Sequence, residues 1–259
     1  MSESVLYHFE EGVATLTLNR PQVFNSFNSE MAARMQQLLD DCAANAEVRA
    51  VVIVGEGKAF CAGQDLAEVS GPLNPGFQSI LADNYNPIVR KIREMEKPVI
   101  GAVNGVAAGA GANIALCCDI VVASETSSFI QAFSKIGLIP DSGGTYVLPR
   151  LIGFQKASAL MMLGDKVDAN TAEKMGMIYK VFTAETFATE VKNLALQLAQ
   201  MPTYGLALTK KALNSSMTNS FEQQLQIEES LQIKAGRSND YSEGVTAFME
   251  KRKPNFKGN

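Results

Sequence analysis

The chain has 259 residues, 46% of them hydrophobic, which is enough for one large α/β domain or for a domain with an appendage. Its formal net charge of -4 gives no reason to expect a nucleic acid or an anionic membrane surface as a partner. Because His8 is the only histidine, a Ser-His-Asp or Cys-His mechanism would depend on that residue, and zinc sites built on several histidines are excluded. If the chain is an enzyme, we therefore expect its proton transfer to depend on carboxylate, lysine or tyrosine side chains.

The four cysteines show no CxxC or Cys/His ligand spacing, so we expect buried, reduced thiols in a cytoplasmic protein and no metal site. Acidic residues surround the short apolar run near the N-terminus, which is not typical of a secretory signal. Residues 98–118 carry no charge and are long enough to span a bilayer, but Asn104, Asn113 and several glycines interrupt them. We interpret this stretch as buried core and expect no membrane contact.

In chain order, the first predicted element is a β-hairpin, since residues 5–20 alternate apolar and polar side chains on both sides of Gly12. A helix follows, with Asn28 or Ser29 as its cap, and ends near Asn45. The nearly continuous apolar run over residues 48–54 predicts a strand that is buried on both faces.

In the sequence KAFCAGQDL at residues 58–66, a short apolar segment is followed by a glycine just before a predicted helix start. Asp65 is expected to cap that helix. The Gly/Pro-rich residues 70–76 are a candidate flexible cover for a site, and a helix is expected from about Ile80 to Glu94.

The same junction recurs in PVIGAVNGVAAGAGAN, residues 98–113, which we expect to organise the chain. Its β-branched start predicts a buried strand at 99–103, and its run of alanine and glycine leads into a helix around residues 114–116. The first N–H groups of such a helix are unpaired, and with so few side chains nearby they can approach a ligand oxygen. Alternatively, the small residues only allow the helix to pack tightly against a sheet.

The second half of the chain begins with strands and ends in helices. A strand at 119–123 and an extended piece at 126–133 precede the glycine-rich loop 137–144. Further predicted elements are helices at 148–163, 169–175 and 184–200, a strand at 177–182, and amphipathic helices at 204–214, 221–235 and 240–251. The strand, strand, helix order predicts a layered α/β core over residues 1–200, and residues 201–259 are predicted to pack on another subunit.

Five motifs together resemble the enoyl-CoA hydratase/isomerase (crotonase) family: LNRP, KAFCAGQDL, AVNGVAAGAG, IGLIPDSGGT and EGVTAFMEKRKPNF. The resemblance covers essentially the whole chain. It implies an α/β crotonase fold of stacked β-β-α units followed by a C-terminal helical trimerisation region, assembled as a trimer or a dimer of trimers. It also implies an acyl-CoA thioester substrate, with no separate cofactor because coenzyme A is part of the substrate.

The family resemblance also implies an oxyanion hole made by the backbone N–H groups of Gln64 and Ala110, which would stabilise an enolate. Hydratases of the family carry two glutamates, and their positions fall here at Asn113 and Phe133, so water addition should be poor. Isomerases that use one acid have an aspartate where this chain has Asp141, which we expect to be the catalytic residue. From local sequence alone, the same aspartate could instead cap a helix.

The remaining site predictions also follow from the resemblance. The substrate pocket is expected to include Gly109, Asn113 and Phe133. The CoA moiety is expected to lie near Asn25, Ala62, Asp65, Leu66 and Lys251, the last reaching a neighbouring subunit's site.

The motifs are most similar to the isomerases of phenylacetate degradation, which convert epoxyphenylacetyl-CoA to an oxepin isomer, and the same residues could also move the double bond of a 3-enoyl-CoA. The alternatives are an enoyl-CoA hydratase or 3,2-enoyl-CoA isomerase of fatty-acid oxidation and, in another class, a non-catalytic acyl-CoA-binding or scaffold subunit. An enoyl-CoA hydratase of the same pathway is a candidate partner.

Overall fold

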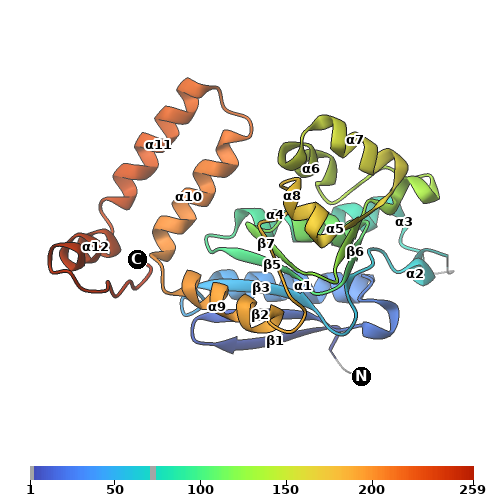
Figure 1. The fold of residues 1–259 in the computed structure, drawn as a ribbon, viewed down its shortest axis with the longest axis horizontal. Helices are drawn as coiled ribbons and strands as arrows, with labels where there is room; N and C mark the ends of the chain where they lie inside the picture. Colours follow the sequence, from blue (N-terminus) through green and yellow to red (C-terminus); the bar gives the residue numbers. More distant parts are fainter. Residues whose placement is uncertain (1–2, 71–73) are drawn as a thin grey trace.

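Two β-sheets form the frame of the computed structural model, which describes residues 3–70 and 74–259 (Figure 1). The larger sheet has the order β1-β2-β3-β5-β7-β10 and the smaller has the order β4-β6-β8-β9. The larger sheet contains β1 (Val5–Glu10), β2 (Val13–Leu18), β3 (Ala50–Gly55), β5 (Val99–Val103), β7 (Ile120–Ser124) and β10 (Lys180–Phe182). The smaller contains β4 (Ala59–Cys61), β6 (Val106–Ala108), β8 (Ser128–Ile130) and β9 (Lys166–Asp168).

The N-terminal hairpin and first helix form as the sequence predicts. Strands β1 and β2 pair antiparallel around a turn in which Glu11 and Gly12 both have positive φ. After a short 3-10 turn (Pro21–Val23), helix α1 (Ser29–Ala44) begins at Asn28, whose side chain accepts the N–H of Met31 at 3.0 Å. This bond satisfies one of the unpaired donors of the first turn.

Three successive strand pairs then repeat one pattern, in which the first strand joins the larger sheet and the second joins the smaller. The pairs are β3–β4, β5–β6 and β7–β8, and each pair is parallel to the next. Helical segments follow each pair: α2 (Leu66–Ser70), α3 (Gly76–Ser79), a π-helical turn (Ile80–Tyr85) and α4 (Asn86–Glu94); α5 (Ala110–Leu116); and a 3-10 turn (Ala132–Ile136) before α6 (Gly144–Ile152). The stacked β-β-α units predicted from the sequence are confirmed.

Besides shifts at element ends, such as β10 beginning at Lys180 and the π-helical turn at 80–85, the observed elements differ from the predictions in three places. The alanine and glycine run does not lead directly into α5, because residues 106–108 first form β6 between β4 and β8. The helix expected over 148–163 is divided at Gly153, where φ is 80°, into α6 and α7 (Phe154–Leu163). Strand β9 was not anticipated. Residues 71–73 of the candidate cover loop lie outside the described residues.

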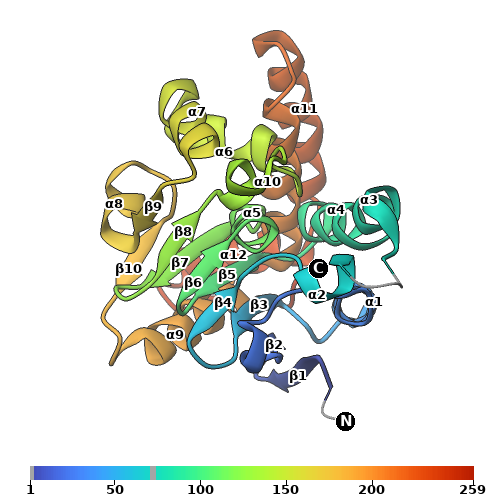
Figure 2. The ribbon, with the colours of Figure 1, turned by 90° about the vertical axis from the view of Figure 1, so that its right-hand side faces the viewer.

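The two faces of the larger sheet are covered differently. On one face lies α9 (Phe187–Ala199), which packs against the buried side chains of Val52, Ile100 and Val122. The other face packs with α1, α4, α5 and the smaller sheet in the main hydrophobic core (Figure 2). Helix α8 (Ala169–Lys174) lies between β9 and β10 in sequence.

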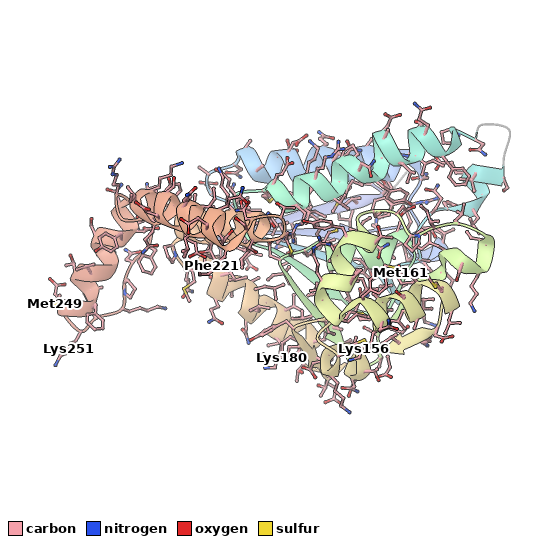
Figure 3. All side chains as sticks on the ribbon, turned by 90° about the horizontal axis from the view of Figure 1, so that it is seen from above. Lys156, Met161, Lys180, Phe221, Met249 and Lys251 are labelled. Atoms are coloured by element: carbon pink, nitrogen blue, oxygen red, sulfur yellow. The ribbon has the colours of Figure 1, made fainter. Side chains whose placement is uncertain are left out.

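The C-terminal helices extend away from this body (Figures 1 and 3). They are α10 (Thr203–Ser216), α11 (Phe221–Ala235) and α12 (Asn239–Met249), as the sequence predicts. Several large apolar side chains remain exposed on them, including Leu213, Phe221 and Phe248. The helical character of residues 201–259 is confirmed, while their part in oligomerisation stays a prediction. Among the described residues, no helix combines the length and the hydrophobicity that are needed to cross a bilayer.

Candidate active site

A cavity of about 530 Å³ lies at the edge of the smaller sheet, where it is lined by the segments that follow β4, β6 and β8. Because parallel strands end at the same edge, these segments converge although they are far apart in sequence. Seven of the predicted site residues line the cavity: Ala62, Gln64, Leu66, Gly109, Ala110, Phe133 and Asp141.

The backbone N–H groups of Gln64 and Ala110 are unpaired within the described part of the chain. Gln64 forms a parallel bridge with Phe27, in which the N–H of Phe27 donates to Gly63 and the N–H of Asp65 donates to Phe27. In such a bridge the amide of the middle residue points away from the partner. Ala110 is the first residue of α5, where the helix itself supplies no acceptor.

Glycines allow these two backbone segments to approach each other. Gly63 has a φ of 94° and Gly109 a φ of 52°, which are conformations that other residues rarely adopt. A Cβ added to Gly63 would lie 3.0 Å from the oxygen of Ala108 and 3.4 Å from the nitrogen of Ala110. The two junctions singled out in the sequence are therefore in direct contact and offer two neighbouring backbone donors.

Asp141 lines the same cavity and is partly shielded from solvent. Burial raises the pKa of its carboxyl group, although a 2.9 Å hydrogen bond from the Ser142 hydroxyl opposes the shift. The alternative role as a helix cap is wrong: Gly143 precedes α6 and no side chain caps that helix. The carboxylate is therefore left available to the cavity.

Asn113 does not line the cavity, contrary to its predicted place in the substrate pocket. It is only 1% exposed, because its side chain lies behind the Asp141 loop. Its Nδ2 donates to the backbone oxygen of Asp141 at 2.9 Å, and its Oδ1 accepts from Gln131 at 2.8 Å. Phe133 does line the cavity, next to Gly109.

Asn25 and Asp65, both predicted to border the CoA moiety, have structural bonds of their own and do not line the cavity. Asn25 is fully buried, and its side chain bonds the backbone of Arg20, Glu56 and Ala59. It is unavailable for a side-chain contact with CoA. The carboxylate of Asp65 forms a 2.8 Å ion pair with Arg20 and accepts the N–H of Ala67 at 3.1 Å, so the predicted helix cap is confirmed.

Lys251 lies at the far end of the C-terminal helices (Figure 3). It does not line the cavity of its own chain. Its predicted contact with the CoA site of a neighbouring subunit stays a prediction.

Sequence reasoning missed Tyr85 and the hydrogen bonds that fix the Gln64 side chain. The buried Tyr85 hydroxyl donates to Oε1 of Gln64 at 2.9 Å, and Nε2 of Gln64 donates to Glu68 at 2.8 Å. Glu68 in turn accepts the N–H of Ser29, at the start of α1, at 2.8 Å. No local pattern indicates this chain of bonds, because its members come from α1, the β4–α2 connection, α2 and the π-helical turn.

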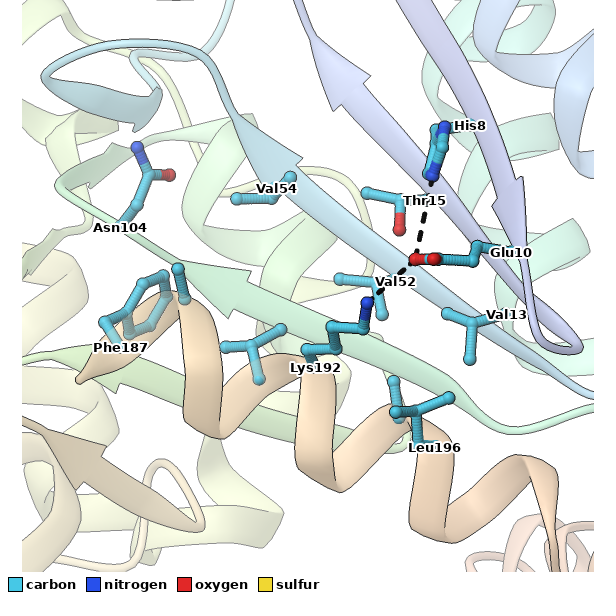
Figure 4. A pocket seen from close by; sticks show the side chains of 13 residues that line it. His8, Glu10, Val13, Thr15, Val52, Val54, Asn104, Phe187, Lys192 and Leu196 are labelled. Atoms are coloured by element: carbon cyan, nitrogen blue, oxygen red, sulfur yellow. Dashed lines mark hydrogen bonds and ion pairs between the residues drawn. The ribbon is translucent and has the colours of Figure 1, made fainter.

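A second cavity, of about 400 Å³, lies between α9 and strands β1 to β3 (Figure 4). Its walls are mostly valine, alanine, leucine and phenylalanine, and they include an ion pair of 2.8 Å between Lys192 and Glu10. His8 belongs to this cavity, so the single histidine is remote from Asp141. None of the predicted site residues lines it. Within residues 3–70 and 74–259, no group of three or more metal-ligating side chains is found.

Comparison with known proteins gives a match over residues 8–259 to the family described as enoyl-CoA hydratase/isomerase. The chain belongs to this family. It is 48% identical to the 1,2-epoxyphenylacetyl-CoA isomerase of Escherichia coli K12, over 100% of both chains. It is 40% identical to a Rhodobacter capsulatus protein named "Probable enoyl-CoA hydratase", over 98% of both chains.

Among solved structures, an enoyl-CoA hydratase from Bacillus anthracis superposes with a TM-score of 0.93 at 29% identity, covering 99% of this chain and 100% of that one. The predicted crotonase fold is confirmed by this likeness and by the family match. The prediction that the chain is an enzyme of the hydratase/isomerase family is confirmed as well.

Proposed function

We propose that this enzyme is a CoA-thioester isomerase that converts epoxyphenylacetyl-CoA to its oxepin isomer, and that it also moves the double bond of a 3-enoyl-CoA into conjugation. The observation that carries the proposal is the single carboxylate of the cavity. Of the described residues that line it, Asp141 alone has an acidic side chain, and it shares the cavity with the free amides of Gln64 and Ala110. One base beside two oxyanion donors suits proton transfer next to a thioester.

In this mechanism the thioester oxygen accepts both backbone N–H groups. The Asp141 carboxylate removes a proton from the carbon beside the carbonyl, and the electron pair of that C–H bond moves into the enolate. For a 3-enoyl-CoA, the protonated Asp141 returns the proton two carbons further along the chain. Because burial raises the pKa of Asp141, its carboxylate is a better base than an exposed aspartate.

The lining of the cavity favours an apolar or aromatic acyl group. Phe77, Tyr85 and Phe133 contribute aromatic rings, and Ile80 and Leu138 contribute aliphatic side chains. Such walls bury a phenyl-sized group without leaving polar atoms unpaired. The 48% identity to an epoxyphenylacetyl-CoA isomerase supports this substrate over other acyl-CoA thioesters.

Water addition is the second candidate function, because several relatives and solved neighbours are named as hydratases. Activation of water between two carboxylates would require a second acidic side chain at the cavity. The two positions at which the family resemblance places the hydratase glutamates hold Asn113 and Phe133 instead. The Asn113 amide is hydrogen-bonded on both sides, and Phe133 lines the cavity. This arrangement favours isomerisation.

We also propose that residues 201–259 join subunits into a trimer or a dimer of trimers.

The test incubates the purified protein with a 3-enoyl-CoA in deuterated water and follows the product by mass spectrometry, beside a matched 2-enoyl-CoA. We expect conversion to the 2-enoyl isomer, loss of that conversion in Asp141→Asn, and no hydration. Asp168→Asn is the matched control, since Asp168 is an exposed cap of α8, and it should keep wild-type activity. The epoxyphenylacetyl thioester is the next substrate.

Hydration of the 2-enoyl-CoA would contradict the isomerase assignment. Binding of CoA thioesters without turnover would favour the non-catalytic acyl-CoA-binding subunit instead.

A further inference from the structure

Helix α5 and the residue that follows it contact the Asp141 loop through two side chains that lie one turn apart. Asn113 donates to the backbone oxygen of Asp141, and one turn later the Cys117 thiol donates to the backbone oxygen of Ser142 at 3.4 Å. The same helix begins at Ala110, whose N–H is one of the two free donors of the cavity. A single short helix thus fixes the distance between the oxyanion donor and the loop that carries the carboxylate.

We propose that Asn113, oriented by Gln131, is a positioning residue that holds the Asp141 carboxylate in register with the Ala110 amide. This proposal rests on the function proposed above, because it assigns a role within that reaction. Neither residue lines the cavity, so each would act through Asp141 rather than on the substrate.

The direction of the hydrogen bonds is determined by one main-chain carbonyl. The oxygen of Asp141 can only accept, so Asn113 must present its Nδ2 to it. Its Oδ1 then faces Gln131, which must offer Nε2 and does so at 2.8 Å. Without the Gln131 donor, the Asn113 amide would lose one of the two bonds that hold it in this orientation.

Packing prevents Asn113 from moving away. A Cβ added to Gly144 would collide with the amide group of the Asn113 side chain, so the backbone at residue 144 rests directly on that amide. Ser142, which lies between Asp141 and Gly144 in the loop, has a φ of 51°, a left-handed conformation that is unusual for a residue with a side chain. The loop is therefore fixed by α5 on one side and by its own conformation on the other.

Burial of this amide pair is costly, so the bonds that it makes to the Asp141 loop have to offset that cost. Asn113 is 1% exposed and Gln131 is 4% exposed. Within the described residues, Oε1 of Gln131 is buried with no hydrogen-bond partner. Leaving such an acceptor unsatisfied destabilises a fold, whereas two apolar side chains of the same size would carry no such cost. The pair is explained by the donor that Gln131 gives to Asn113.

The consequence for catalysis is a loss of rate and not of binding. The thioester oxygen would still be held by Gln64 and Ala110, so KM should change little. A displacement of Asp141 by about 1 Å would lower kcat on the order of 100-fold, because proton transfer depends steeply on distance and angle.

The test compares Asn113→Ala, Gln131→Leu and the double variant in the isomerisation assay, well below their melting temperatures. We expect a fall in kcat of about 100-fold for Asn113→Ala and about tenfold for Gln131→Leu, with KM within about twofold. Since Gln131 acts through Asn113, the double variant should lose no more than Asn113→Ala alone. Asn214→Ala, which removes a 2.9 Å bond to the backbone of Arg93 in α4, is the matched control and should keep wild-type kcat.

A second readout does not need turnover: carbon-13 NMR of labelled aspartate follows the titration of Asp141. Displacement toward solvent in Asn113→Ala should lower the pKa of Asp141 toward its ordinary value. If the wild-type protein isomerises nothing, the proposed function fails, and a shifted titration in Asn113→Ala still supports the positioning role. An unchanged titration with unchanged kcat, or multiplicative losses in the double variant, would overturn it while the isomerase assignment stands.

Discussion

Replacing Gly63 with alanine should impair catalysis far more than folding. Gly63 has a φ of 94°, and its Cα faces the segment that carries the second oxyanion donor. An added Cβ would lie 3.0 Å from the oxygen of Ala108, closer than almost all real Cβ contacts, and 3.4 Å from the nitrogen of Ala110. The two backbone segments would have to move apart to accept it.

Two separate costs are expected. The left-handed backbone conformation costs an alanine about 1–2 kcal/mol of stability. Relief of the contact with Ala108 would also shift the Gln64 amide by a few tenths of an ångström relative to that of Ala110. Because oxyanion donors act over a narrow range of distance, loss of one donor's contribution costs about 3–4 kcal/mol of transition-state stabilisation, which is roughly a 100- to 1,000-fold fall in kcat.

Gly176→Ala separates the two costs. Gly176 has a φ of 80°, and a Cβ there would lie 3.5 Å from the oxygen of Leu151, an ordinary contact. Both variants should lose similar stability in urea unfolding, but only Gly63→Ala should lose kcat on the same thioester. If Gly63→Ala keeps kcat within about threefold of the wild type, or if both variants lose the same activity, the oxyanion assignment is refuted.

Other predictions concern the buried charges. Because burial raises the pKa of Asp141, kcat/KM should fall on the acid side at a pH above the ordinary carboxyl pKa of about 3.9. With a raised pKa, the native state keeps this proton to a higher pH than the unfolded chain does, so the free energy of unfolding falls as the pH rises from the unfolded-state pKa to the native-state pKa. Asp141→Asn should therefore be more stable than the wild type at about pH 7 in urea unfolding. Equal stability of the two proteins would contradict the pKa shift. Lys210, which anchors α10, lies 2.7 Å from the largely buried carboxylate of Asp119. Lys210→Met should lower the free energy of unfolding by about 3–5 kcal/mol, and a loss below about 1 kcal/mol would show that the pair is not needed for stability.

Local sequence patterns predicted the elements whose signals are strong on their own. The alternation around Gly12 and the asparagine cap at Asn28 gave the hairpin and α1 nearly at their observed bounds. Strand β6 was not predicted because alanine has a weak strand preference. Residues 106–108 are extended because they pair with β4 and β8. That pairing depends on tertiary contacts, which no local sequence pattern indicates.

The candidate site was predictable to the extent that it depends on the backbone. Glycines placed just before helix starts indicated the two junctions, the family resemblance indicated Gln64 and Ala110 within them, and the structure brings the two segments together. Asp141 needed the family resemblance, since its local sequence also fits a helix cap. The bond from Gln131 to Asn113 and the bond from Tyr85 to Gln64 join residues that are 18 and 21 positions apart, and nothing in the spacing indicates either.

The buried polar groups of the frame and of the cavity differ in how well they are satisfied. In the frame, Lys97 gives all three donors of its ammonium group to carbonyls at the end of α1. At the cavity, two backbone amides have no partner among the described residues, Asp141 is kept ionisable despite burial, and Ser142 has an unusual positive φ. Such local costs persist only where the surrounding structure overrides them, and they tend to cluster at functional sites. These costs lie at or next to the cavity in which Asp141 and the two backbone amides are proposed to act, so they support the placement of the proposed site there.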